Sequence, residues 1–155
     1  MSAAGLHAVL ERDLRGLFTM PDTIAPTMED VTWFANRGQI FTNPVAHPDL
    51  LPGKPGECWR NAYRAISYDP SLRYVQGLVQ GAHSRILIAH AWCVGEGGTL
   101  YEPTWDVARA TGAEVYLGVV FSLDDLMRLQ DVFGRIGWYN GFADVLSRRR
   151  TREGH

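Results

Sequence analysis

The chain has 155 residues, of which 46% are hydrophobic, and its formal net charge is −2. This length and apolar content predict a single folded domain over residues 1–155 and exclude a disordered chain, while the balanced charge excludes the broad basic surface that nucleic-acid binding needs. No apolar run reaches the roughly 18 residues of a membrane-spanning helix, and two cysteines are too few for a disulfide framework, so we expect a cytoplasmic protein that does not enter a membrane.

The first third of the chain divides into a helix and an irregular region. Residues 1–19 carry apolar side chains at helical spacing, which predicts an amphipathic N-terminal helix. Residues 20–55 hold six of the eight prolines, and proline is excluded from helix interiors and central strands. We therefore expect this Pro-rich region to be mostly loop, with at most a short helix at Met28–Asn36.

Residues 56–121 combine a helix with several strand patterns. A helix is expected over Glu57–Ser67, and Asp69-Pro70 ends it. Runs rich in β-branched and aromatic residues then predict three or four strands, with a hairpin turn at residues 95–98 between the second and the third. The expected strands are Leu72–Val79, Arg85–Val94, Thr99–Trp105 and Glu114–Phe121.

Residues 122–155 predict C-terminal helices and a basic tail. Ser122 is a good N-cap for a helix over Leu123–Phe133, whose first turn is acidic. The arginines that follow are expected to form a solvated end rather than a nucleic-acid arm. The whole pattern predicts an α+β fold in which a Cys-bearing helix packs on an antiparallel sheet of about four strands, with flanking helices.

Cys58 lies at the start of a predicted helix, behind a glycine-containing turn. Unpaired N–H groups and the positive end of the helix dipole favour a negative sulfur there, so the position predicts a lowered pKa and a thiolate nucleophile. The alternative is a structural cysteine, because free cysteine is among the most buried residue types.

His90 lies in the apolar sequence ILIAHAWCVG. Strand alternation puts His90, Trp92 and Val94 on one face, with Ala91 and Cys93 on the other. Burying an unpaired imidazole costs about 1–3 kcal/mol, so a carboxylate or a thiol is expected to meet the ring. The alternative is a core histidine bonded to a backbone carbonyl.

Glu102 follows His90 across the predicted hairpin turn. If this turn closes a hairpin, residues 102–104 lie beside His90, where a carboxylate would orient the imidazole. The alternative is an ordinary glutamate on an edge strand, which Pro103 favours because proline cannot donate to a strand ladder.

Cys58, His90 and Glu102 together supply the nucleophile, the base and the orienting acid that cysteine catalysis requires. A metal site is not expected, because His90 and Cys93 are three apart on a strand and no CxxC or HExxH motif is present. Cys93 is therefore expected in the core. No Gly-rich phosphate loop follows a strand, so no nucleotide or other cofactor is expected.

These features together resemble the core of transglutaminase-like proteins in the papain-like cysteine superfamily. The resemblance is carried by Cys58 at a helix start, YVQGLVQG, HAWCV, the glycine turn and YEPTW, and it spans residues 55–121. It implies a papain/transglutaminase-like core in which Cys58 is the nucleophile and His90 the base. Glu102 stands where the family usually has an aspartate, and the resemblance implies that it orients His90.

The resemblance also raises the question of substrate and oxyanion contacts. The family uses a glutamine or an aromatic residue ahead of the cysteine as oxyanion donor. Gln39 and Asn43, in the Pro-rich region, are the candidates in this chain, and the backbone N–H of Cys58 is a further donor. The candidates for contacts with substrate are Trp59, Trp92 and Trp105.

Two functions remain open. The first is a small transglutaminase-like cysteine enzyme that attacks a peptide or amide carbonyl through a Cys58 thioester, as a protease, deamidase or acyltransferase. The second is a non-catalytic phage or bacterial factor that keeps the fold and binds a protein. The glutamate in place of aspartate and the unmatched oxyanion donor favour the second. In both, the partner is a peptide or a protein.

Overall fold

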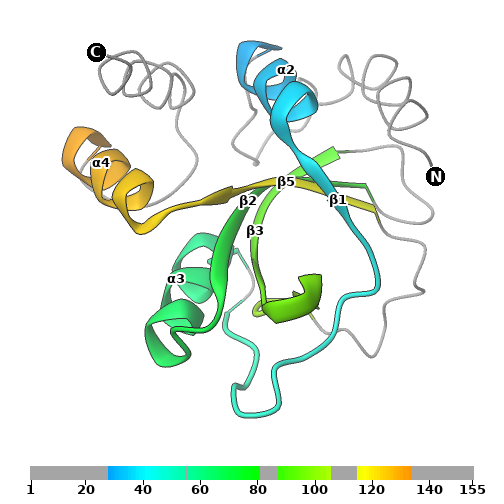
Figure 1. Cartoon of the computed structure of the whole chain (residues 1–155), viewed down its shortest axis with the longest axis vertical. Coiled ribbons are helices and arrows are strands. Elements are labelled where there is room, and N and C mark those ends of the chain that lie inside the picture. Colours follow the sequence, from blue (N-terminus) through cyan, green and yellow to red (C-terminus); the bar gives the residue numbers. More distant parts are fainter. Residues whose placement is uncertain (1–27, 55, 81–86, 106–114, 134–155) are drawn as a thin grey trace.

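The computed structural model of the chain describes residues 28–54, 56–80, 87–105 and 115–133 (Figure 1). The predicted helix of residues 1–19 and the predicted basic tail lie outside these ranges. The described elements, in chain order, are α2 (Met28–Arg37), β1 (Gln39–Phe41), α3 (Cys58–Tyr68), β2 (Arg73–Gln80), β3 (Leu87–Val94), the short 3-10 helix η1 (Glu96–Gly98), β4 (Leu100–Tyr101), β5 (Val115–Phe121) and α4 (Leu123–Phe133).

Five strands form one antiparallel sheet in the order β1-β5-β2-β3-β4. The chain after β1, at one edge, reaches β4 at the other edge, where Val45 forms a parallel bridge with Tyr101. At this bridge the N–H of Val45 donates to Leu100 O (2.9 Å), and the N–H of Glu102 donates to Val45 O (3.0 Å). The sheet is therefore curled, and the segment after β1 links its two edges.

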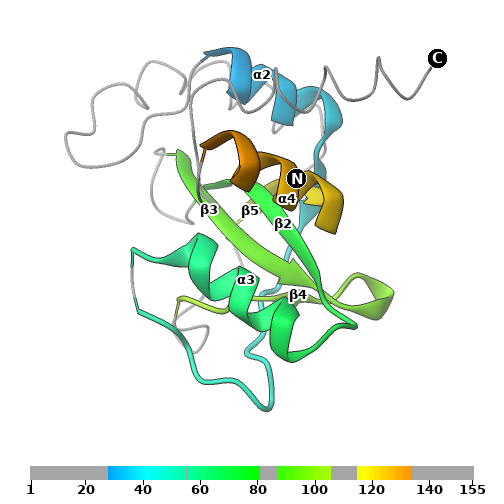
Figure 2. The ribbon, with the colours of Figure 1, turned by 90° about the vertical axis from the view of Figure 1, so that its left-hand side faces the viewer.

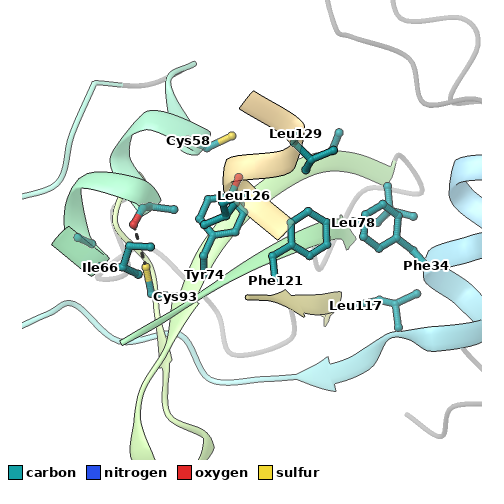
Figure 3. Close-up of a cluster of buried hydrophobic side chains, with 14 of the residues drawn as sticks. Phe34, Cys58, Ile66, Tyr74, Leu78, Cys93, Leu117, Phe121, Leu126 and Leu129 are labelled. Carbon is teal, nitrogen blue, oxygen red and sulfur yellow. Dashed lines mark hydrogen bonds between the residues drawn. The ribbon is translucent and has the colours of Figure 1, made fainter. Parts of the chain in front are cut away.

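Helices cover one face of the sheet. Side chains from α2, α3 and α4 pack on alternate residues of β2, β3 and β5, and together they make the helix-side core. Figure 2 shows α3 and α4 in front of these strands, and Figure 3 shows side chains of this core between helices and sheet. Its members include Phe34, Cys58, Ile66, Tyr74, Leu78, Ala91, Cys93, Leu117, Phe121, Leu126 and Leu129.

The opposite face of the sheet carries a second core, named here the far-side core. Trp92 and Tyr116 meet in it edge to face, with ring centroids 5.0 Å apart. Because neighbouring residues of a strand point to opposite faces, β3 gives Ala91 and Cys93 to the helix-side core and Trp92 to the far-side core, as the predicted alternation requires. The members of the far-side core are Phe41, Val75, Val79, Trp92, Val94, Leu100 and Tyr116.

The α+β class is confirmed, but the sheet has five strands rather than about four. The additional strand is β1, in the region that was expected to be mostly loop. β1 has only three residues, and it pairs with β5, which is the last strand of the sheet in sequence order. A pairing between segments so distant in sequence leaves no local pattern, because the β-propensity of a short segment depends on its neighbours in the sheet.

β4 is shorter than the predicted strand Thr99–Trp105, since only Leu100–Tyr101 pair with β3. The N–H of Glu102 donates to the loop at Val45, and Pro103 has no N–H to give to a ladder. The chain therefore leaves the ladder after Tyr101. As Pro103 indicated, β4 is an edge strand.

The helices are short, and their ends follow local rules. Ser122 caps α4 as predicted: the N–H of Asp125 donates to Ser122 Oγ (3.0 Å), and the N–H of Ser122 donates to Asp125 Oδ2 (3.1 Å). α3 begins and ends one residue later than the predicted helix Glu57–Ser67. Within the described ranges, none of the helices combines the length and the apolar composition that crossing a membrane requires.

Candidate functional site

The β3–β4 hairpin brings His90 and Glu102 together. β4 pairs with β3 at Cys93 and Val94, across the turn formed by η1. Just beyond these pairs, Nε2 of His90 lies 2.6 Å from Oε1 of Glu102, and both side chains are almost completely buried. The predicted approach of Glu102 to His90 is confirmed, and the buried imidazole has a carboxylate partner.

The Glu102 carboxylate is bonded on both of its oxygens. Oε1 meets His90 Nε2 and accepts a hydrogen bond from the hydroxyl of Tyr116 (3.0 Å). Oε2 accepts from the backbone N–H of Thr104 (3.0 Å) and from that of Trp105 (3.3 Å). Every partner is able to donate, which is the arrangement that suits an ionised carboxylate, because that group only accepts.

This bonding selects the tautomer of His90. A carboxylate oxygen has no proton to give, so Nε2 must carry the hydrogen and donate it to Oε1. In the neutral ring, Nδ1 is then the basic nitrogen that can take up a proton. Glu102 therefore holds His90 in one tautomer.

Aromatic rings enclose this pair. The indole of Trp105 stacks on the imidazole of His90, with centroids 3.6 Å apart and planes 5° apart. Tyr116 approaches the same imidazole edge-on at 6.3 Å. Trp105 is partly exposed whereas His90 is only 1% exposed, so Trp105 forms part of the cover between the imidazole and solvent. Exclusion of water strengthens the electrostatic interaction between His90 and Glu102.

Cys58 is the first residue of α3 and is buried in the helix-side core (Figure 3). Burial raises the pKa of its thiol from 9.0 to about 11; backbone N–H groups, those of Ala91 and Trp59 above all, oppose the rise, and the charge of Glu102 adds to it. The predicted lowering of this pKa is therefore wrong. The N–H groups at the helix start do favour the thiolate, but the loss of solvation outweighs them.

The side chains of Cys58 and His90 lie on opposite faces of β3, the strand that contains His90. The sulfur lies beside the backbone N–H of Ala91, the residue after His90, at a point of β3 that β4 does not pair. Among the described residues, no hydrogen bond joins the Cys58 thiol to the His90 ring. Cys58 belongs to α3 and His90 to β3, and the thiol reaches β3 at Ala91, a position that β4 does not pair.

Asn61 ties α3 to the segment that carries Glu102. Asn61 lies on α3, one turn after Cys58, and its side chain is buried. Its Nδ2 donates to Thr104 Oγ1 (2.9 Å) and to Lys54 O (3.0 Å). These bonds set the position of the helix that bears the cysteine relative to the segment that bears the acid.

Gly53 closes the same junction from the loop before α3. Its N–H donates to Pro103 O (2.8 Å). A Cβ at Gly53 would lie only 2.0 Å from Asn61 Oδ1, so no larger residue fits without displacing the amide. The loop, α3 and the residues after Glu102 are therefore packed directly on one another.

Neither predicted oxyanion side chain is joined to this site. Gln39 is exposed on β1, which lies at the opposite edge of the sheet from β4. Asn43 is exposed in the loop after β1, where its φ is 59°, and within the described chain it has no hydrogen bond to Cys58 or His90. The N–H groups beside the sulfur are instead those of Ala91, Trp59 and Cys58 itself.

The three tryptophans expected to contact substrate lie in different environments. Trp92 is 0% exposed in the far-side core, so the prediction is wrong for this residue because its ring does not reach the surface. Trp105 is partly exposed over His90, and Trp59 is partly exposed next to Cys58 on α3. Within the described part of the chain, the indole N–H of Trp59 is buried without a hydrogen-bond partner.

Two residues of the site, Tyr116 and Asn61, are not predicted from the sequence. Tyr116 lies in the predicted strand Glu114–Phe121, but its contact with Glu102 joins β5 to the hairpin and has no local signature. Asn61 did leave a signal, because it is a polar residue among the buried positions of α3, next to Ala62. A buried amide needs hydrogen-bond partners, so the position of Asn61 predicts a bond between α3 and another segment.

A second histidine–carboxylate pair lies away from this site. Nε2 of His47, in the loop before α3, is 3.0 Å from Oδ2 of Asp69, which follows α3. The Ser71 hydroxyl and then His47 lower the pKa of Asp69. This pair fastens the loop to the C-terminal end of α3.

Cys93 is a core residue, as predicted. It is completely buried, its Sγ donates to Ala62 O (3.5 Å), and burial raises the pKa of its thiol to about 12. Within the described ranges, no three His, Cys, Asp or Glu side chains are grouped so that they could hold a metal ion.

Comparisons of the chain with protein-family models, with curated proteins and with solved structures gave no significant match.

Proposed function

We propose that the protein is a small transglutaminase-like cysteine enzyme with a papain-like core, which attacks a peptide or amide carbonyl with Cys58, His90 and Glu102. The observation that carries the proposal is the buried His90–Glu102 pair, whose Nε2 and Oε1 are 2.6 Å apart, with the Cys58 sulfur beside the next residue of the same strand. This chemistry needs a nucleophile, a base and an orienting acid, and we assign these roles to Cys58, His90 and Glu102.

The reaction begins from a neutral thiol, because a pKa of about 11 leaves little thiolate at neutral pH. His90 Nδ1 takes the thiol proton while the sulfur bonds to the carbonyl carbon. The electron pair of the C=O bond moves to oxygen, and the backbone N–H groups of Cys58 and Trp59 are the available donors to this oxyanion. Glu102 stabilises the imidazolium that forms.

The tetrahedral intermediate then collapses. Its C–N bond breaks, the His90 imidazolium gives its proton to the departing amine, and an acyl thioester remains on Cys58. Water attacks the thioester in a protease or deamidase, and a second amine attacks it in an acyltransferase. In either case His90 takes the proton of the attacking group and returns it to the sulfur as the C–S bond breaks.

Acylation by an activated ester tests the proposal. After incubation with p-nitrophenyl acetate at neutral pH, mass spectrometry should find the acetyl group on Cys58. His90→Ala should slow this acylation by about 10²–10⁴-fold, because the general base is lost. Cys58→Ser should remove the thioester, and Cys93→Ser is the matched control that should keep it. If wild-type Cys58 reacts no faster than Cys58 in His90→Ala, the protein is not a cysteine enzyme.

A non-catalytic protein-binding factor is the second candidate, and the state of Cys58 favours it. The residue is only 5% exposed, its pKa is raised to about 11, and within the described chain its thiol has no hydrogen bond to His90. These are the properties of an inert structural cysteine. A wild-type protein with an inert Cys58 in the ester experiment would support this candidate.

A further inference from the structure

We propose that Tyr116 is a positioning residue, which fixes the Glu102 carboxylate so that a glutamate can orient His90. The inference rests on the proposed function, because it assigns Tyr116 a part in the same site. The hydroxyl of Tyr116 donates to Oε1 of Glu102 (3.0 Å), the oxygen that also meets His90 Nε2 at 2.6 Å. Tyr116 therefore acts on His90 through the carboxylate.

The bond from Tyr116 is well placed to control the carboxylate. Tyr116 lies on β5, so it reaches Glu102 from outside the hairpin that carries His90. Its side chain is buried in the far-side core, where the ring packs against Trp92. A buried ring has little rotational freedom, and the position of its hydroxyl is set by the sheet.

A glutamate needs this support more than an aspartate would. Its arm has one more methylene, and therefore one more rotatable bond, between backbone and carboxylate. The backbone N–H groups of Thr104 and Trp105 hold Oε2 of Glu102. With Oε2 held, the donor on Oε1 decides whether the carboxylate plane faces His90 Nε2.

The chemical consequence is control of the His90 tautomer. With Oε1 fixed, hydrogen remains on Nε2 and Nδ1 stays basic. Without the phenol, the carboxylate can rotate about its Oε2 contacts, and the tautomer with hydrogen on Nδ1 becomes populated. That tautomer cannot accept a proton from the thiol at Nδ1.

Tyr116→Phe tests the inference, because it removes the hydroxyl and keeps the ring. The matched control is Tyr74→Phe: Tyr74 is also buried and donates to Gln76 Oε1 (2.8 Å), but it lies in the helix-side core. Nitrogen NMR of the imidazole should show a second His90 tautomer in Tyr116→Phe alone. Acetylation of Cys58 by p-nitrophenyl acetate should slow about tenfold in that variant, because a hydrogen bond to a charged group is lost.

The Glu102→Ala background shows whether Tyr116 acts through Glu102. There, Tyr116→Phe should change the acetylation rate by less than about twofold, because the oxygen that accepts from both Tyr116 and His90 is already absent. A full tenfold effect in this background would overturn the inference, as would an unchanged His90 spectrum in Tyr116→Phe. If wild-type Cys58 is not acetylated, the proposed function fails, and the nitrogen spectra alone decide the role of Tyr116: a second tautomer supports it, and identical spectra overturn it.

Discussion

The two faces of β3 accommodate buried polar groups in different ways. On the far side, His90 is buried with a carboxylate partner, and the carboxylate of Glu102 is bonded at both oxygens. On the helix side, Cys58 and Cys93 are buried among apolar side chains, and burial raises the pKa of each thiol. Hydrogen bonds satisfy the buried polar groups on one face of the strand, and burial disfavours the thiolates on the other.

This difference shows that burial affects an imidazole–carboxylate pair and a thiol in different ways. A buried imidazole–carboxylate pair persists because several donors replace the lost water. A thiol needs no such replacement while it stays neutral, so it remains protonated instead. In the proposed enzyme, the acid–base half of the site is therefore assembled in advance, and the nucleophile is formed only when His90 takes its proton.

The largest expected effect comes from removing the Glu102 carboxyl group on the far side. Glu102→Ala leaves His90, Tyr116 and two backbone N–H groups without their acceptor, so we expect the free energy of unfolding to fall by about 3–5 kcal/mol. Urea denaturation followed by tryptophan fluorescence measures this. Glu96→Ala is the control, because Glu96 is exposed on η1 and its loss should be almost neutral. A loss below about 1 kcal/mol for Glu102→Ala would mean that the pair does not hold the far side together.

The junction between the two faces gives the next effect. Asn61→Leu removes the bonds to Thr104 Oγ1 and Lys54 O: the buried Thr104 hydroxyl loses this donor, whereas Lys54 O keeps the N–H of Glu57 (3.3 Å). We expect a loss of about 1–3 kcal/mol in the free energy of unfolding. Ser67→Ala, on the exposed side of the same helix, is the matched control and should change it by less than about 0.5 kcal/mol. Equal effects of the two substitutions would show that Asn61 is not a junction.

The smallest effect compares the two thiols on the helix side. Because both pKa values are raised, both thiols are protonated at neutral pH, and iodoacetamide labelling should increase with pH. With a pKa of about 11 for Cys58 and about 12 for Cys93, Cys58 has the larger thiolate fraction at any pH below both values. Labelling followed by peptide mass spectrometry should show that Cys58 reacts faster than Cys93.

The same experiment sharpens the comparison between the faces. If His90 acts as a base on Cys58, labelling of Cys58 at neutral pH should exceed the rate that its thiolate fraction allows, and His90→Ala should bring it down to that rate. If the ratio of Cys58 to Cys93 labelling is the same in wild type and in His90→Ala, His90 does not act as a base on Cys58.

Much of the architecture could be predicted because it depends on local sequence patterns. The alternation in β3, the cap at Ser122 and the glycine turn before β4 each depend on residues that are close in sequence. β1 could not be predicted, because its three residues are a strand only through β5. Likewise, the shortening of β4 depends on a hydrogen bond from Glu102 to Val45 in a distant loop.

For the candidate site, the sequence by itself determined that His90 would be buried, that Glu102 would reach it, and that Cys58 would begin a helix. These follow from strand period, hairpin closure and glycine placement, which are properties of short segments. Only the tertiary structure decided the charge of the cysteine and the anchoring of the acid. The solvation of a group and the hydrogen-bond donors around it depend on what the whole fold packs against it. Burial therefore raised the pKa of Cys58, which was expected to be lowered, and Tyr116, on the separate strand β5, donates a hydrogen bond to Glu102.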